Sequence, residues 1–176
     1  MSLDSRVLAA LGAVVVVGAA TVGVSVNAAA GQTANSDHRV TLTVGRSSSV
    51  HNPLCFNDGK PLSLEQQRRC TTDAKNALKD GTLPSSDVRL SDRIGIGVTP
   101  EVAKTGWASF SNGGAEGAGG QFPISNFAKK VTFSGLLPAS SVVNGTGQTL
   151  ISVYEGEKDG ENPTAIWYFV LNTKED

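Results

Sequence analysis

The strongest constraint on the fold is an apolar run near the C-terminus, "AIWYFVL", residues 165–171. In an extended strand, successive side chains point to opposite faces, so both faces of this strand are apolar. One face carries Trp167, Phe169 and Leu171, and the other carries Ile166, Tyr168 and Val170. A strand of this kind is stable only when both faces are buried. The sequence therefore predicts a strand that other parts of the chain cover on both sides.

Other segments also have the pattern of short strands. In "RVTLTVG", Val40, Leu42 and Val44 alternate with threonines, which predicts a half-buried strand. Later segments of the same kind are short and bounded by Gly, Pro, Asn or Asp: "VRLSDRIGIGVTP", "GWASFSNG", "KKVTFSG", "QTLISVYEG" and "TAIWYFVLN". Strands at this spacing, in a chain with 20 glycines, predict a sandwich or barrel of antiparallel sheet.

One segment, residues 63–81, has the period of a helix instead. Ser63 and Gln66 form a capping-box pattern at its start, and Gly81 can end it. One face of this helix would carry Cys70, Ala74, Ala77 and Leu78. Cys70 is therefore predicted on the buried side of the helix.

Two glycine-containing segments have the composition of connections. "SNGGAEGAGGQ" holds five glycines in eleven residues, and we expect a mobile loop there. "LLPASSVVNGTGQ" is expected to be an irregular connection. The "NGT" within it favours a turn over a glycosylation site.

The N-terminal segment determines where the protein resides. Residues 7–26, "VLAALGAVVVVGAATVGVSV", are 20 uncharged residues, and a helix of about that length crosses a bilayer. Against a retained helix, the three alanines before Gly31 form a small-residue cleavage site, so cleavage after Ala30 stays open. We expect retention, with a transmembrane signal anchor at 1–30, a linker at 31–38 and one domain at 39–176.

Cys55 and Cys70 are the only cysteines, and both follow the apolar segment. A cysteine pair in an exported domain most often forms a disulfide. Closing a loop of about 15 residues would stabilise the fold by about 3 kcal/mol. The sequence therefore predicts a Cys55–Cys70 disulfide in a single-pass protein of the cell membrane, with the C-terminal domain outside the cytoplasm.

Charge and candidate ligands exclude several functions. The 15 basic and 16 acidic residues are mixed along the chain, which gives no electrostatic footprint for nucleic acid. A metal site built from His38, His51 and Cys55 would have too few ligands. Ser49, His51 and Asp58 could form a catalytic triad, but the chain has no nucleophile elbow. We therefore expect no catalytic residue, metal or cofactor, and a protein that is not an enzyme.

Two tryptophans in strand-like segments indicate positions in the core, and two glycines indicate a surface that another element could contact. Trp107 and Trp167 are expected to be core anchors rather than ligand platforms. In "RIGIGVT", Gly95 and Gly97 share one face, and a glycine-lined face lets another backbone or helix approach closely. Gly95 and Gly97 are thus a candidate docking face, unless the protein's own helix fills it.

Several motifs together resemble a family of exported actinobacterial proteins, catalogued as domain-of-unknown-function family 2771. They are "CFNDGKPLS", the cysteine of "RRC", "RIGIGVTPEVAKTGWASFSNG" and "IWYFVLN", and the likeness covers residues 41–172. The resemblance implies a small lipoprotein with an immunoglobulin-like sandwich, and the family has no assigned reaction to carry over. This chain lacks the lipobox cysteine, so the apolar helix would replace the lipid anchor.

Taken together, these features predict an immunoglobulin-like antiparallel β-sandwich with one disulfide-tethered helix, preceded by one transmembrane helix. We expect an accessory structural subunit of an actinobacterial membrane complex, in contact with the bilayer and with other membrane-protein subunits. The respiratory cytochrome bc–oxidase supercomplex is the assembly we expect first, although no residue specifies it. The anchor would pack on a neighbouring helix through Ala9, Ala13, Ala19 and Gly23. The alternative is an exported small-ligand or metal-binding module of the cell envelope.

Overall fold

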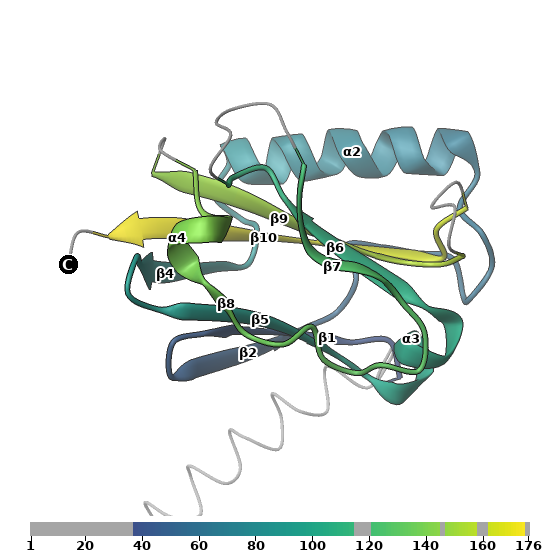
Figure 1. The fold of residues 1–176 in the computed structure, drawn as a ribbon. Helices are drawn as coiled ribbons and strands as arrows, with labels where there is room; N and C mark the ends of the chain where they lie inside the picture. The colour runs from purple at the N-terminus through teal and green to yellow at the C-terminus, as the bar shows by residue number, and fades with distance from the viewer. Residues whose placement is uncertain (1–36, 115–120, 145–146, 158–161, 175–176) are drawn as a thin grey trace, which may run out of the picture. The chain divides into compact units, whose positions relative to one another are not determined.

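The computed structural model describes residues 37–114, 121–144, 147–157 and 162–174, which form two β-sheets and three helices (Figure 1). The smaller sheet has the strand order β2 (Ser47–His51), β1 (Val40–Val44), β5 (Arg93–Val98) and β8 (Leu137–Pro138). All of its neighbouring strands are antiparallel. The prediction of a mainly β fold with antiparallel sheets is confirmed.

The larger sheet is built around the long C-terminal strand. Its order is β3 (Cys55–Phe56), β10 (Ala165–Lys174), β9 (Gln148–Glu155), β6 (Trp107–Ser111) and β7 (Phe122–Ala128). A further strand, β4 (Ser85–Arg89), pairs in parallel with the second half of β10, while β3 pairs with its first residues. Because β9 lies along the other edge of β10, residues 165–166 and 170–172 have paired neighbours on both sides.

The two sheets face each other across the main apolar core. Val40, Leu42 and Val44 are buried as predicted, and they pack with inward side chains of the larger sheet. Trp107 and Trp167 are both almost fully buried in this core, which confirms that they are core anchors. The Trp107 indole Nε1 donates a hydrogen bond to the Val131 carbonyl at 2.7 Å, which satisfies its polar atom.

Helix α2 (Leu64–Lys79) covers part of the outer face of the larger sheet. Ile166, Tyr168 and Val170 of β10 are buried beneath it, in a second apolar cluster that also contains Cys70 and Ala74. The alternate residues of β10 point into the main core. The prediction that this strand is covered on both sides is confirmed. Burying each large apolar side chain contributes roughly 1.5–3 kcal/mol.

The ends of α2 follow the sequence signals. Ser63 accepts a hydrogen bond from the Gln66 backbone, and the Gln66 side chain accepts one from the Ser63 backbone, so the capping box is present. At the other end, the Thr82 amide donates to the Ala77 carbonyl at 2.9 Å. Gly81 occupies the intervening left-handed position, with φ of +66°. This is the Schellman arrangement, in which glycine is favoured.

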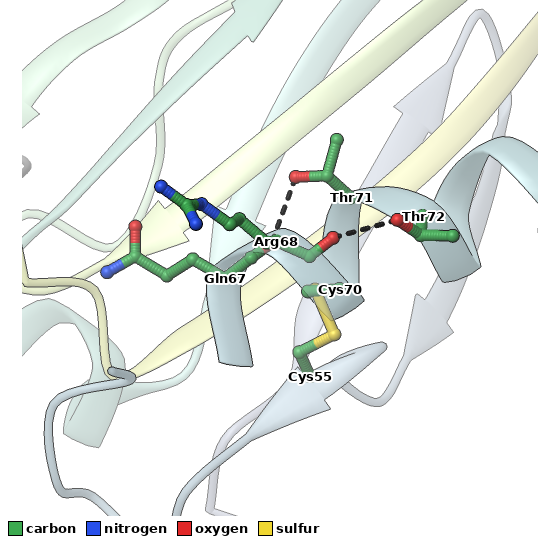
Figure 2. Close-up of a disulfide and its surroundings, with 6 residues drawn as sticks. All are labelled: Cys55, Gln67, Arg68, Cys70, Thr71 and Thr72. Carbon is green, nitrogen blue, oxygen red and sulfur yellow. Dashed lines mark hydrogen bonds between the residues drawn. A yellow bond between two sulfur atoms is a disulfide. The ribbon is translucent and has the colours of Figure 1, made fainter. Parts of the chain in front are cut away.

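A disulfide between Cys55 and Cys70 joins α2 to the edge strand β3 (Figure 2). The two Cα atoms are 5.9 Å apart, within the usual range for a disulfide. The predicted disulfide is therefore confirmed. It fixes the helix covalently to the sheet whose outer face the helix buries.

Several elements differ from the sequence-based expectations. Strands β2 and β7 were not predicted, nor was helix α3 (Pro100–Thr105), which has Pro at its first turn. "KKVTFSG" is not a regular strand and makes a single bridge, between Phe133 and Gly97. The segment expected to be irregular contains β8 and the short helix α4 (Ala139–Val142).

The predicted membrane anchor lies outside the described residues. This applies to residues 1–30, including Ala9, Ala13, Ala19 and Gly23, and to linker residues 31–36. The core of the predicted glycine loop, residues 115–120, also lies outside them. Within the described part of the chain, no helix is both long and apolar enough to cross a membrane.

We expect the domain to lose stability at alkaline pH because Tyr168 is buried beneath α2. Burial and, after it, the neighbouring Tyr154 together raise the pKa of Tyr168 from 10.0 to about 12. The folded-state pKa is above the unfolded one, so the protonated Tyr168 side chain stabilises the folded state. This stabilisation is fully present below pH 10 and is lost as the pH rises to 12. We expect the free energy of unfolding to fall by roughly 2–3 kcal/mol across this interval. Denaturant titrations of the wild type and Tyr168→Phe measure the effect, and parallel losses in both proteins would contradict it.

Candidate functional site

The outer face of the larger sheet carries an open cleft beside the region that α2 covers. The apolar cluster beneath the helix includes side chains of β3, β9 and β10, but none of β6 or β7. The cleft has a volume of 410 Å³. The side chains that line it include Phe110, Gln121, Asn126, Phe127, Tyr154 and Glu157. The incomplete cover of the sheet therefore leaves aromatic side chains available to a ligand.

Two aromatic rings form the floor of the cleft. Phe110 of β6 and Tyr154 of β9 lie on adjacent antiparallel strands, and both are half-buried. Their ring centroids are 6.2 Å apart, and the ring planes are inclined by 58°. The Tyr154 side chain also packs against the apolar cluster beneath α2 that contains Tyr168. The two rings thus meet as a corner rather than as a flat surface.

Gly106 positions the third ring, Phe127 of β7. A Cβ atom on Gly106 would lie 2.5 Å from Cζ of Phe127, so only glycine lets the ring approach this closely. Gly106 also has φ of +116°, a conformation that other residues rarely adopt. Its carbonyl accepts a hydrogen bond from the Gly156 amide at 3.0 Å. The glycine of the "GW" pair therefore shapes the cleft, while its neighbour Trp107 anchors the core.

The polar lining of the cleft has a negative bias. Gln121 and Asn126 contribute amides, and Glu157 contributes an exposed carboxylate. Glu155 is also a lining residue, although its buried side chain points to the opposite face of the sheet from Tyr154. Its carboxylate is engaged by His38. No Lys, Arg or His occurs among the described residues that line the cleft. These groups can bind and orient a ligand.

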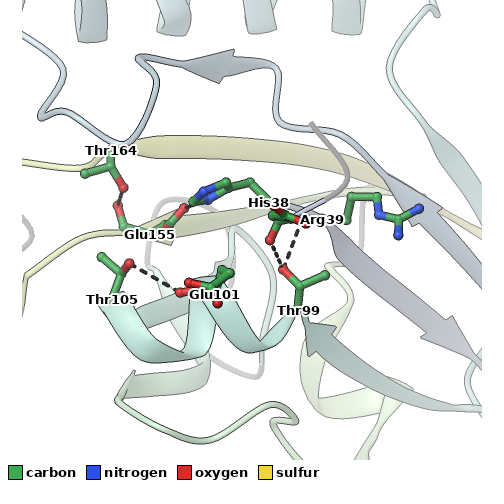
Figure 3. A network of polar contacts seen from close by, with 8 residues as sticks. His38, Arg39, Thr99, Glu101, Thr105, Glu155 and Thr164 are labelled. Carbon is green, nitrogen blue, oxygen red and sulfur yellow. Dashed lines mark hydrogen bonds and ion pairs between the residues drawn. The ribbon is translucent and has the colours of Figure 1, made fainter. Parts of the chain in front are cut away.

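A polar contact that the sequence patterns do not reveal joins His38 to the buried carboxylate of Glu155 (Figure 3). The Glu155 side chain is only 1% exposed, and its Oε2 lies 2.8 Å from Nδ1 of His38. The His38 ring also packs against Phe56, with ring centroids 4.7 Å apart. A buried carboxylate without a partner is costly, so His38 stabilises this position of β9. The sequence pattern suggests only a metal-ligand role for His38.

A second polar contact holds the same end of the domain. The Thr99 hydroxyl donates a hydrogen bond to the Asp37 carbonyl at 2.5 Å and accepts one from the Arg39 amide at 3.3 Å (Figure 3). Thr99 directly precedes α3. The chain entering β1 is therefore attached to two other parts of the fold, β9 and the start of α3.

The residues considered for a metal site or a triad have other contacts. Both cysteine sulfurs are in the disulfide, so neither is a thiolate ligand. The His51 ring packs edge-on against Phe169 at a centroid distance of 5.3 Å. Burial lowers the pKa of His51. Among the described residues, no three His, Cys, Asp or Glu side chains cluster as metal ligands would.

The candidate docking face at Gly95 and Gly97 is largely occupied by the chain itself. The Val98 amide donates to the Thr132 carbonyl at 2.9 Å, which places residues 131–135 alongside β5. A Cβ on Gly95 would lie 2.9 Å from the Phe133 ring. The glycines do admit a closely packed neighbour, but at Gly95 that neighbour is Phe133 and not a separate molecule. The expectation of an external docking face is corrected there.

The segment that covers Gly95 has an apolar surface of its own. Val131, Phe133 and Leu136 are each 45–47% exposed. Three half-exposed large apolar side chains within six residues are unusual on a soluble surface. We call residues 131–136 the apolar segment.

Comparisons of the chain with protein-family models, curated proteins and solved structures give no match.

The His38–Glu155 contact predicts a specific loss of stability. His38→Ala leaves the buried Glu155 carboxylate without its partner and should lower the free energy of unfolding by about 1–3 kcal/mol. Chemical denaturation of the full chain measures this. Glu101→Ala is the matched control, because it removes an exposed pair with Lys104 that should contribute little. Equal effects of the two variants would show that His38 does not support Glu155.

Proposed function

We propose that this chain is a non-catalytic binding domain of the cell envelope, which holds a small ligand in the cleft over β6, β7 and β9. The aromatic cleft is the observation that carries the proposal. Its volume of 410 Å³ falls within the range of small-molecule sites, roughly 300–1,000 Å³. Like such sites, it combines apolar walls with a few polar groups that could orient a ligand.

The side chains in the cleft favour binding over catalysis. Phe110, Phe127 and Tyr154 provide apolar contact area, and the amides of Gln121 and Asn126 can donate and accept hydrogen bonds. Glu155, the buried carboxylate, is already engaged by His38. A nucleophile with an adjacent base, which covalent catalysis requires, is not among the described lining residues.

The location outside the cytoplasm and the membrane anchor are part of the proposal. The disulfide supports export, because disulfides persist mainly in oxidising compartments. The 20-residue uncharged segment at 7–26 supports a retained anchor. Two mainly antiparallel sheets with a buried tryptophan between them are compatible with an immunoglobulin-like sandwich. Helix α2 and the parallel β4–β10 pair would be additions to that pattern.

A second candidate function is an accessory subunit of an actinobacterial membrane complex, with the respiratory supercomplex as the first assembly to test. The exposed apolar segment, residues 131–136, favours this candidate. Apolar side chains are enriched at the centre of protein–protein interfaces. The segment lies along β5 of the smaller sheet, whereas the cleft lies on the larger sheet, so the two surfaces can be tested separately.

The ligand-binding proposal can be tested with two fluorine signals. The chain has two tyrosines, so labelling with 3-fluorotyrosine reports on Tyr154 in the cleft and Tyr168 beneath α2. We expect hits from a fragment library to shift the Tyr154 resonance of the full-length protein more than that of Tyr168. Gly106→Ala should displace the Phe127 ring and reduce this response. If no fragment shifts Tyr154 selectively, the cleft is not a binding site.

The accessory-subunit candidate predicts that the apolar segment is needed for assembly. Phe133→Asp should weaken co-purification of partner subunits from mild-detergent extracts, because it places a charge in the proposed interface. Lys129→Asp is the control, since it introduces the same residue at a nearby exposed polar position. Quantitative mass spectrometry of the extracts measures the partners. Equal recovery with both variants would remove the apolar segment from the interface.

A further inference from the structure

We propose that the cleft recognises a small organic cation with an alkylammonium group. This inference rests on the proposed function, in which the cleft is a ligand site. It adds the chemical class of the ligand, which follows from the arrangement of the rings and from the charge of the lining residues.

The inclined rings favour a compact cation over a flat molecule. A sugar ring or a planar base stacks best on an aromatic surface parallel to itself. Phe110 and Tyr154 are instead inclined by 58° with centroids 6.2 Å apart, so they do not form one flat stacking surface. An ammonium group within about 6 Å of a ring centroid is attracted by the negative ring face. Phe127, held by Gly106, adds a third ring to the lining.

The charge of the lining favours the same ligand. Glu157 places an exposed carboxylate at the cleft, and no described lining residue is a Lys, Arg or His. A cation is therefore attracted by both the rings and the carboxylate, whereas an anion is repelled. The amides of Gln121 and Asn126 can hydrogen-bond a hydroxyl or carbonyl group elsewhere on the ligand.

The alkylammonium group could belong to a free metabolite or to the headgroup of a lipid. Both sources present the same chemistry to the cleft. They differ in whether acyl chains contribute to the affinity, so a soluble cation and a short-chain lipid with the same headgroup distinguish them.

The test compares choline with 3,3-dimethylbutan-1-ol, which has nearly the same shape but no charge. Each is titrated into the full-length, fluorotyrosine-labelled protein in a maltoside detergent, which carries no ammonium group. We expect choline to shift the Tyr154 signal and to bind at least about tenfold more tightly than the neutral analogue. Short-chain phosphatidylcholine forms a second arm. Tighter binding than choline would identify a lipid headgroup, and weaker or equal binding a free cation.

Two variants assign the effect to the cleft. Glu157→Gln keeps the size of an exposed side chain but removes its charge. It should weaken the binding of choline about two- to fivefold and leave the affinity for the neutral analogue unchanged. Phe110→Leu removes one ring of the cleft and should also weaken the binding of choline. Phe133→Leu, which removes a ring outside the cleft, should not.

Three results would overturn the inference. These are equal affinity for choline and its neutral analogue, no binding of choline, or choline binding that neither cleft variant changes. The fragment library separates this failure from that of the proposed function. If fragments shift Tyr154 but choline does not, the cleft binds a different class of ligand. If neither does, both proposals fail.

Discussion

The fold depends on burying both faces of β10. Trp167, Phe169 and Leu171 complete the core between the sheets, and the alternate residues are buried only because α2 lies over them. Without the helix, a large apolar surface of the sheet would face water, and each exposed side chain would cost a few kcal/mol. The disulfide serves this contact directly. Cys55 is paired with Ile166 in the sheet, so the covalent link to α2 lies beside the strand that needs the cover.

The cleft follows from the limited cover that one helix provides. The cluster beneath α2 contains side chains of β3, β9 and β10. It contains no side chain of β6 or β7. Phe110 and Phe127 are therefore half-buried instead of fully packed. Tyr154 lies at the boundary, because it contacts the cluster beneath the helix and also lines the cleft. The stability of the helical layer and the shape of the candidate site thus share a residue.

The sequence predicted the parts of this fold that depend on local periodicity. Alternation identified β1, β5 and β10, and the capping box and Gly81 identified both ends of α2. It missed β2, whose "SSSVH" has few apolar residues, and β7, where Pro123 interrupts the strand pattern. It also missed the site. His38 and Glu155 are 117 residues apart, and the three cleft rings come from three strands whose pairing no local pattern encodes.

Strand β9 connects the candidate site to the beginning of the domain. Tyr154 and Glu155 are consecutive, so they point to opposite faces of the larger sheet. The tyrosine faces the cleft, and the glutamate carboxylate contacts His38, two residues before β1. The amide of Gly156, the next residue, donates a hydrogen bond to the Gly106 carbonyl. The absence of a side chain on Gly106 leaves room for the Phe127 ring. The cleft is therefore built on the part of the larger sheet that also holds the chain entering β1. Residues 154–156 thus contact the cleft, His38 before β1, and Gly106 before β6.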